Sequence, residues 1–238
     1  MKKSNRKRNL VLSILFFLPV LFLLMLYPAK HNYTPLDIVN EKVNEFHNFK
    51  SDSGSEILLS DHITIIGFLG YNPISNSIAA SNLKELIYDK FKGFKKFQIV
   101  IVQPYGSEQA VEQLKKEINS YQDLRFWHYV FANEEQISEL YKSLKSSKAL
   151  DQYLATDLVF VVDKDLNQRG RIDARDKKEI EEKKPEYSLY DYDCIEIDQI
   201  KNKMSEDLRI LFTEYRQKRK GQFDSSTRRA SDLKIDNG

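Results

Sequence analysis

The sequence predicts an N-terminal membrane-spanning helix followed by one α/β domain with three layers. Three observations lead to this prediction. An uncharged apolar run occupies residues 10–27, and from residue 57 onward strand patterns alternate with amphipathic helix patterns. The alternation then ends in a β-hairpin followed by a helix. A chain of 238 residues has room for one such domain, an anchor and short accessory segments.

The apolar run has Ser13 as its only polar residue and Pro19 near its middle. Its length is near the short end of what spans a hydrocarbon core. A cleaved signal peptide is the alternative interpretation. However, the run exceeds the apolar stretch of about 7–15 residues found in signal peptides, and no small-x-small cleavage pattern follows it. We therefore expect residues 10–27 to stay in the protein as a membrane anchor.

Basic residues are concentrated ahead of the anchor. Five of the first eight residues are Lys or Arg, and the rest of the chain carries 32 Lys and Arg against 35 Asp and Glu. By the positive-inside rule, we expect a cytoplasmic N-terminus and an extracytoplasmic domain in the cell (inner) membrane. Because the domain has no excess of positive charge, the composition argues against nucleic-acid binding.

Composition and turn signals divide the chain into four expected segments. These are a basic tip with the anchor (1–30), a membrane-proximal helix and linker (31–56), the α/β domain (57–217) and a disordered polar tail (218–238). The membrane-proximal helix is expected because Thr34, Pro35 and Asp37 resemble a capped helix start. Its apolar residues then recur at spacings of three and four: Leu36, Val39, Val43 and Phe46.

Within the domain, strands are expected at residues 63–69, 97–102, 124–131, 158–162 and 169–172. Helices are expected at residues 77–91, after Ser107, after Asn133 and at residues 198–216. Several of the strands are near-continuous apolar runs, which is typical of strands buried on both faces. Alternating strands and helices imply right-handed crossovers and a largely parallel sheet.

Three segments resemble the SCO/SenC group of thioredoxin-fold proteins: DHITIIGFLG (61–70), LVFVVDKDLNQRGRID (158–173) and IDQIKNKMSEDLRILFTEYR (197–216). The order of the expected elements is also similar to the thioredoxin plan. The resemblance covers residues 57–217 and implies a thioredoxin-like three-layer fold preceded by one transmembrane helix. It also implies an origin among membrane-anchored proteins associated with copper delivery to respiratory oxidase.

The residues that this resemblance would need for copper chemistry are missing from the sequence. In that family, a C-x-x-x-C lies in the loop after the first core strand and a histidine precedes the fourth strand. Here the corresponding segments read GYNPISN (70–76) and DQYLAT (151–156). Thiolate and imidazole groups are the ligands that suit copper. The resemblance therefore carries over no catalytic, metal-binding or cofactor-binding residue, and copper binding is not expected.

The loop that stands in place of the cysteine motif is the degenerate site that the sequence singles out: Tyr71, Asn72, Pro73, Ser75 and Asn76. It lies at the carboxyl end of a strand and the start of a helix, where backbone N–H groups have no helical partner. Its polar residues fit two interpretations. They can cap the helix, which their types favour, or they can contact a ligand.

The single cysteine, Cys194, excludes an intramolecular disulfide and a cysteine-pair metal site within one chain. It is either a small buried side chain or a lone thiol available for reaction. Asp193 and Glu196 are adjacent negative charges that raise a thiol pKa, which argues against a reactive thiolate. The surrounding segment, residues 187–196, is acidic and rich in tyrosine. It is either a partner surface or a loop that closes over the sheet edge.

Two further patterns are interpreted as structural. Asp163, Asp165 and Asn167 are spaced as at the start of a calcium loop, but Gln168 and Ala174 stand where that loop needs Gly and Glu. A β-hairpin turn explains these residues better. The four histidines show no sign of converging on a metal, and none is proposed as a site residue: His31, His47, His62 and His128.

The sequence therefore favours a non-catalytic, membrane-anchored thioredoxin-like protein of the cell envelope. We expect it to bind another protein, as an assembly factor related to the SCO/SenC proteins, and to need no cofactor. The alternative is a copper carrier or thiol-redox protein that uses Cys194 and ligands foreign to the family. The cysteine-free loop favours the first hypothesis, whereas a copper carrier would have a Cu(I) affinity that disappears in Cys194→Ser.

Overall fold

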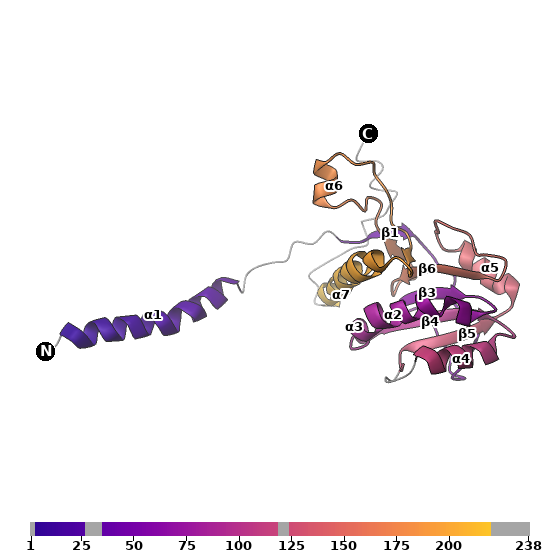
Figure 1. The fold of residues 1–238 in the computed structure, drawn as a ribbon, viewed down its shortest axis with the longest axis horizontal. Coiled ribbons are helices and arrows are strands. Elements are labelled where there is room, and N and C mark those ends of the chain that lie inside the picture. Colours follow the sequence, from indigo (N-terminus) through magenta and orange to yellow (C-terminus); the bar gives the residue numbers. More distant parts are fainter. Residues whose placement is uncertain (1–2, 27–34, 119–123, 220–238) are drawn as a thin grey trace. The chain divides into compact units, whose positions relative to one another are not determined.

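The computed structural model describes residues 3–26, 35–118 and 124–219 (Figure 1). The chain divides into two compact units, Met1–Thr34 and Pro35–Gly238. The first contains helix α1 (Lys3–Leu26), which includes Pro19. Its stretch Lys7–Met25 is long and apolar enough to cross a membrane, and none of that stretch is buried. The expected apolar N-terminal helix is thus present.

The second unit is built on one sheet with the strand order β1-β7-β6-β3-β4-β5-β2, and β8 also pairs with β6. The strands are β1 (Asp37–Asn40), β2 (Lys50–Ser51), β3 (Ile63–Leu69), β4 (Phe97–Pro104), β5 (Trp127–Ala132), β6 (Ala155–Val162), β7 (Gln168–Gly170) and β8 (Tyr192–Asp193). β3, β4 and β5 are parallel to one another, whereas β6 runs antiparallel to β3 and is followed by the hairpin strand β7.

The central strands form where the sequence is a run of β-branched and aromatic residues. Every residue of β3 and of β4 is buried, as expected for strands covered on both faces. The other expected strands are present with shifted ends: β5 begins at Trp127 rather than Leu124, and β6 begins at Ala155 rather than Leu158. Boundaries are where local patterns are least informative, because pairing with neighbouring strands decides them.

The helices are α2 (Ser77–Leu83), α3 (Asp89–Phe91), α4 (Glu108–Ile118), α5 (Glu134–Lys142), α6 (Lys177–Glu181) and α7 (Ser205–Arg219). A 3₁₀ turn, η1 (Pro73–Asn76), precedes α2, and π-helical turns η2 (Lys84–Tyr88) and η3 (Gln199–Met204) lead into α3 and α7. The helix expected at residues 77–91 is thus continuous, with a wider π-helical turn at Lys84–Tyr88. The cap expected before α5 is also present, as a capping box between Asn133 and Gln136.

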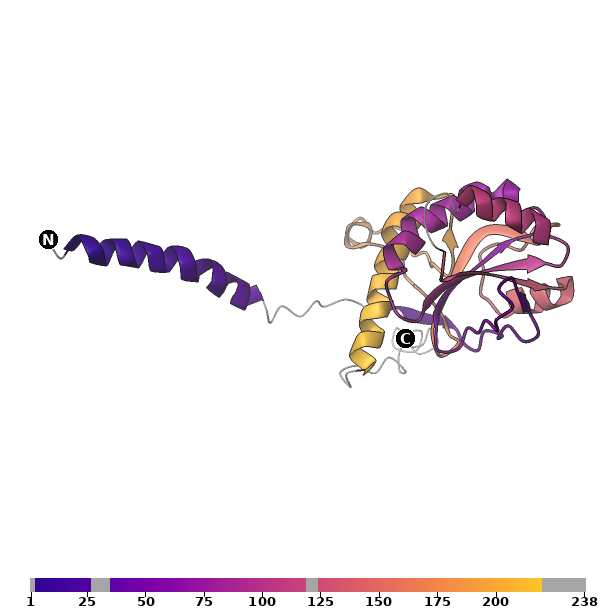
Figure 2. The same cartoon turned by 90° about the horizontal axis from the view of Figure 1, so that it is seen from below.

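Helices cover both faces of the sheet (Figure 2). On one face, α5 and the segment 43–59 pack on a core that includes Phe68, Val100 and Phe160. On the other face lie α2, α3, α4 and α7, and the ring of Phe212 in α7 packs against Phe97 of β4. A central mixed sheet with helices on both sides, ending in β6, β7 and α7, is the thioredoxin-like arrangement that the sequence predicts.

The helix expected near residues 34–46 is not present, and that prediction is wrong. Residues Asp37–Asn40 form strand β1, which pairs antiparallel with β7 and places Ile38 opposite Arg169. The apolar residues of the segment are buried all the same, because they pack on the domain. Beyond β1 the chain is irregular rather than helical, and the Val43 N–H donates to the Leu166 carbonyl at 2.9 Å. Pairing with the β6–β7 hairpin therefore outweighs the local helical pattern.

The two ends of the domain also differ from the expected boundaries. Part of the expected linker, residues 37–40, belongs to the sheet. Helix α7 continues to Arg219, so residues 218 and 219 are helical rather than part of a tail. The rest of the expected disordered tail, residues 220–238, lies outside the described residues, as does Thr34.

The β6–β7 turn is the hairpin turn that the sequence predicts. The Asp163 carboxylate accepts the backbone N–H groups of Asp165 and Asn167 through Oδ1, each at 2.9 Å. Leu166 takes a left-handed conformation with φ of 62°. The other carboxylate oxygen, Oδ2, accepts a bond of 2.9 Å from Arg169. Both oxygens of Asp163 are therefore engaged in holding the turn and strand β7 together.

An arm formed by residues 172–188 leaves the sheet after β7 and carries α6 (Figure 1). Its base is closed by a pair of backbone hydrogen bonds of 2.8 Å between Arg171 and Leu189. A glycine is required beside this closure. A Cβ added at Gly170 would lie 2.4 Å from the carbonyl oxygen of Leu189.

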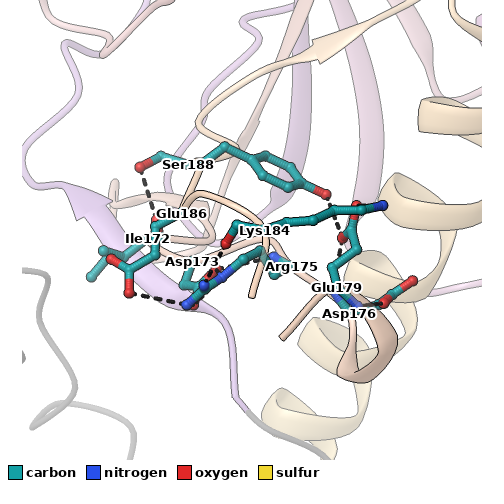
Figure 3. A network of polar contacts seen from close by, with 9 residues as sticks. Ile172, Asp173, Arg175, Asp176, Glu179, Lys184, Glu186 and Ser188 are labelled. Atoms are coloured by element: carbon teal, nitrogen blue, oxygen red, sulfur yellow. Dashed lines mark hydrogen bonds and ion pairs between the residues drawn. The ribbon is translucent and has the colours of Figure 1, made fainter. Parts of the chain in front are cut away.

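Ion pairs and hydrogen bonds within the arm hold its shape (Figure 3). The Arg175 guanidinium donates to the carboxylates of Asp173 and Glu186 at 2.7 and 3.0 Å. This guanidinium holds the pKa of Asp173 below its usual value. Asp176 and Glu179 form a capping box at the start of α6. The arm is therefore ordered by local polar contacts rather than by a core.

Candidate functional site

The predicted site loop connects β3 to α2 and lies directly against the segment that precedes β6. The Tyr71 N–H donates to the Tyr153 carbonyl at 3.1 Å. Gly70 has a φ of 67°, and a Cβ added there would lie 2.3 Å from the same carbonyl oxygen. Only glycine fits this close approach with a left-handed backbone. The loop and the segment before β6 therefore form one surface.

Tyr71 ties this surface to helix α5. Its hydroxyl donates to Oε1 of Glu134, the first residue of α5, at 2.7 Å. This hydrogen bond is the main reason why the pKa of Tyr71 lies above its usual value, with burial and the carboxylate charge adding to the effect. The side chain is nevertheless 39% exposed. Tyr71 therefore presents an aromatic face to solvent in a fixed orientation.

The remaining loop residues are held by bonds within the loop. Pro73 is buried at the start of η1. The Ser75 hydroxyl donates to the Asn72 carbonyl at 2.7 Å, and the Asn76 amide donates to the Leu69 carbonyl at 3.1 Å. Neither asparagine caps a helix through its side chain. The capping interpretation is therefore wrong for the side chains of Asn72 and Asn76. The Asn76 side chain bonds to a backbone carbonyl instead.

Two exposed tyrosines that the sequence interpretation missed lie at the same end of the sheet. Tyr105 directly follows β4, and its N–H donates to the Ala132 carbonyl at the end of β5 at 2.9 Å. Tyr153 precedes β6, whose residue Ala155 pairs with Leu69 at the end of β3. Tyr105 lies three residues after the strand expected at 97–102 and Tyr153 five residues before the one expected at 158–162, so the sequence carries only a weak signal for them. We call Tyr71, Tyr105 and Tyr153 the tyrosine edge.

The start of β6 adds negative charge beside the tyrosine edge. The Asp151 carboxylate accepts the N–H groups of Tyr153 and Ala155, each at 2.8 Å. Asp157 is partly buried, and its pKa lies above its usual value because of burial and the nearby charge of Asp193. The sheet end therefore offers aromatic rings next to carboxylates.

Cys194 lies on the inner side of this region and is 1% exposed. Its N–H donates to the Asp157 carbonyl at 2.8 Å, and its carbonyl accepts the Asn82 amide at 2.9 Å. The residue borders a small cavity of about 10 Å³ that is also lined by Gly67 and Ala79. Burial, with Asp193 and Asp157 nearby, raises the pKa of the thiol. The thiol therefore stays protonated and out of reach of large reagents.

The tyrosine-rich segment before Cys194 is largely built into the fold. Tyr192 is fully buried in β8, and its hydroxyl donates to the Asp207 carboxylate at 2.8 Å. Asp191 accepts the N–H and the hydroxyl of Ser147 at 2.6 and 3.0 Å. This agrees with the interpretation of a loop that closes over the sheet. Tyr187 and Tyr190 remain partly exposed.

The histidines do not gather at this site. His62 Nδ1 lies 3.0 Å from the Ser60 carbonyl oxygen, and His47 is exposed. Burial lowers the pKa of His128, against an opposing effect of Asp52. His31 lies outside the described residues. Among the residues that the structure describes, no three His, Cys, Asp or Glu side chains are grouped so as to hold a metal ion.

No protein-family model and no curated protein matches the chain. Several solved structures are similar to it. One is a SCO1/SenC family lipoprotein from Bacillus anthracis, 12% identical, with a TM-score of 0.48 and coverage of 75% of this chain and 98% of that one. A second is the soluble domain of Sco1 from Bacillus subtilis, 16% identical, with a TM-score of 0.41 and coverage of 72% and 92%.

A third similar structure is the thioredoxin domain of a thiol-disulfide oxidoreductase from Bacteroides vulgatus. It is 14% identical, with a TM-score of 0.38, and the match covers 57% of this chain and 86% of that one. The solved structures similar to the chain thus include SCO1/SenC family proteins and a thioredoxin domain of an oxidoreductase.

Proposed function

We propose that this protein is a membrane-anchored, non-catalytic member of the thioredoxin-like proteins that binds another protein through the tyrosine edge. The main support for this proposal is the residue composition of the β3–α2 loop. Where the SCO/SenC resemblance expects two thiols, the loop presents Tyr71, oriented by Glu134, and no sulfur. Tyrosine suits a protein interface because it contributes contact area and a hydrogen bond at a low cost in conformational entropy.

The anchor part of the proposal is supported by α1 and by the charges that precede it. Its apolar stretch is long enough to span a bilayer. The basic residues at the N-terminus favour the cytoplasmic side, so the domain would lie outside the cytoplasm, in the cell envelope. A role in assembling respiratory or redox complexes follows from the SCO/SenC resemblance and is the most specific form of the proposal.

The alternative, a copper carrier or thiol-redox protein that uses Cys194, is less well supported. A soft metal ligand or a nucleophile must be a thiolate that the other reactant can reach. Cys194 is buried and its pKa is raised, both of which oppose this. The alternative would need a second conformation in which β8 leaves β6.

Photo-crosslinking in native membranes tests the binding site. A photoreactive phenylalanine analogue replaces Tyr153, which is 56% exposed, or Ile180 on the arm, which is 51% exposed. The similar exposure makes Ile180 a matched control. We expect a discrete adduct from position 153 that is absent from position 180. The same adducts from both positions, or none from position 153, would remove the tyrosine edge as the binding surface.

A Cu(I) competition titration of the full chain in detergent tests the alternative, with Cys194→Ser as the control. We expect no binding beyond that of a weak chelator in either protein. Tight stoichiometric binding that is lost in Cys194→Ser would show that a metal site has been rebuilt around this residue, and the non-catalytic proposal would be wrong.

A further inference from the structure

A group of cations lies along α7 and the segments packed beside it. They come from α3, η3 and α7 and from the turns before β4 and after β6. All are exposed except Lys164, which is partly buried. Within the described part of the chain, the ion pairs of this region involve other residues, such as Lys92 and Lys218. We call this surface the basic band: Lys90, Lys95, Lys96, Lys164, Lys201, Arg209, Arg216 and Arg219.

Contacts between the segments make the band one continuous surface. Arg209, Thr213 and Arg216 follow one another at spacings of four and three on the solvent side of α7. The Phe94 ring stacks on Phe212 of α7 at 4.3 Å, so the turn before β4 lies alongside that helix. Figure 2 shows α7 in yellow, extending along one side of the domain.

The cations are close enough to affect one another. Burial, together with the charges of Arg209 and Lys201, lowers the pKa of Lys90. Burial and the charge of Lys96 lower the pKa of Lys164, with Arg219 adding to the effect and Asp61 and Asp165 opposing it. Like charges gathered in this way destabilise a free surface and favour an anionic partner.

This concentration is not a consequence of a basic composition. Beyond the first eight residues, the chain has 32 Lys and Arg against 35 Asp and Glu. Exposed cations also lie elsewhere on the domain, for example at Lys116 and Lys142. The band is distinguished by cations near enough to one another to shift their pKa values. A local cluster of like charges orients a protein against a surface of opposite charge.

The chain enters the domain next to this band. The Leu36 carbonyl accepts a bond of 2.8 Å from Arg169, and the same guanidinium donates to Glu214 of α7 at 2.7 Å. Lys218 of α7 lies 3.5 Å from Glu214 as well. Helix α1 ends at Leu26, ten residues before Leu36. A chain of that length reaches at most about 35 Å, which limits how far Leu36 can be from the end of α1.

We propose that the basic band docks on anionic phospholipid headgroups of the membrane that α1 spans. This inference rests on the anchor in the proposed function. The occupant is argued from charge complementarity and from the ten residues that separate the end of α1 from Leu36. The partly buried rings of Phe94 and Tyr215 lie among the cations. Aromatic rings beside basic residues are typical of a membrane–water interface.

The test uses the full chain in proteoliposomes of phosphatidylcholine, with or without phosphatidylglycerol. About 30 mol% phosphatidylglycerol gives the vesicle a negative surface potential. The background is Cys194→Ser, with a fluorophore on Thr213→Cys in the band or on Ile180→Cys in the arm. Headgroup-labelled lipids quench the dye when it lies at the surface. We expect quenching at position 213 that requires phosphatidylglycerol and weakens at high salt, with less quenching at position 180.

Charge variants with the same net charge change provide the matched comparison. The band variant combines Lys96→Gln, Arg209→Gln, Arg216→Gln and Arg219→Gln, and the control combines Lys116→Gln, Lys142→Gln, Lys177→Gln and Lys183→Gln. Each cation near an anionic leaflet strengthens binding by roughly fivefold, so the band variant should lower the docked-to-free ratio by more than about tenfold. The control variant should dock like the parent protein.

The outcomes separate this proposal from the proposed function. Quenching at position 213 that does not depend on phosphatidylglycerol, or equal loss in both variants, would overturn the docking proposal alone. Binding of soluble polyglutamate to the band without any dependence on lipid charge would also overturn it, and would favour an acidic protein as the partner. Release of the chain from the vesicles by alkaline carbonate would overturn the anchor, and the docking proposal with it.

Discussion

Two polar regions of the domain are built in opposite ways. At the tyrosine edge, Tyr71 and Tyr153 are exposed and held mainly by backbone contacts. Beside β7, the side chains of Asp163, Arg169 and Glu214 form an ion-paired cluster that is at most 1% exposed. The side chains of the first region are accessible to a binding partner, whereas those of the second contact only other residues of the domain.

The buried cluster lies within two of the segments that resemble the SCO/SenC group. The segment at residues 158–173 includes Asp163 and Arg169, and the segment at 197–216 includes Glu214. All three charged residues are used to join the β6–β7 hairpin to α7. The two segments therefore contain residues that hold the scaffold together.

Arg169→Met is expected to have the largest effect on this contrast. It leaves the buried Asp163 carboxylate without its cation and Glu214 with Lys218 alone, at 3.5 Å, and breaking a buried ion pair in this way costs about 3–5 kcal/mol. The measurement is urea unfolding followed by the fluorescence of Trp127, the only tryptophan. Unfolding at the wild-type urea midpoint would show that the cluster is not a structural ion network.

Gly70→Ala should have the next largest effect, and Gly54→Ala is its control. Both glycines have a positive φ, 67° and 71°, so each alanine costs about 1–2 kcal/mol from backbone strain. A Cβ at position 54 meets nothing within 4 Å, whereas one at position 70 meets the Tyr153 carbonyl at 2.3 Å. We expect Gly70→Ala to cost roughly 1–3 kcal/mol more than Gly54→Ala. Equal losses would mean that the loop moves away easily.

Arg175→Met is expected to change stability much less than Arg169→Met, because its ion pairs are exposed. Its effect should depend on pH. The Asp173 pKa is lowered in the folded protein, mainly by Arg175, so the pair stabilises the fold above the usual pKa of an aspartate. That stabilisation is lost as the pH falls through the lowered pKa. A difference between the variant and the wild type that persists unchanged below that pH would contradict this account.

The smallest effect is expected for Cys194, which should not react with iodoacetamide in the folded protein at neutral pH. Burial and the neighbouring Asp193 and Asp157 raise its pKa, so little thiolate forms. Mass spectrometry before and after denaturation in urea measures this directly. We expect alkylation only in urea. Rapid labelling of the folded protein would show that the Cys194 thiol is accessible and would support the thiol alternative.

Much of the fold could be predicted because local and tertiary preferences agree. The apolar run of Ile63–Leu69 suits a strand on local grounds and is also buried on both faces. Asn133 and Gln136 form a capping box that depends only on neighbouring residues. The hairpin turn at Asp163 is likewise fixed by bonds that span four residues or fewer.

The rest depends on partners that are distant in sequence. The apolar residues from Leu36 to Phe46 fit a helix by their spacing, and only pairing of β1 with β7 makes the segment extended. Arg169 is expected in the short strand at residues 169–172, but nothing local predicts its burial, which depends on Glu214, 45 positions away. At the site, the loop could be located, but the convergence of Tyr105 and Tyr153 depends on the sheet topology.

Strand β1 has a consequence for where the polypeptide can be cut. It is the outermost strand beside β7, and it begins only two residues after the boundary between the two units. Removing residues 1–34 leaves every described strand in place. Removing residues 1–46 instead would strip β1 and leave the backbone groups of β7 open to pairing with another molecule. A protease that cuts just ahead of Pro35 would therefore release a folded domain, whereas one that cuts a dozen residues later would release an aggregation-prone fragment.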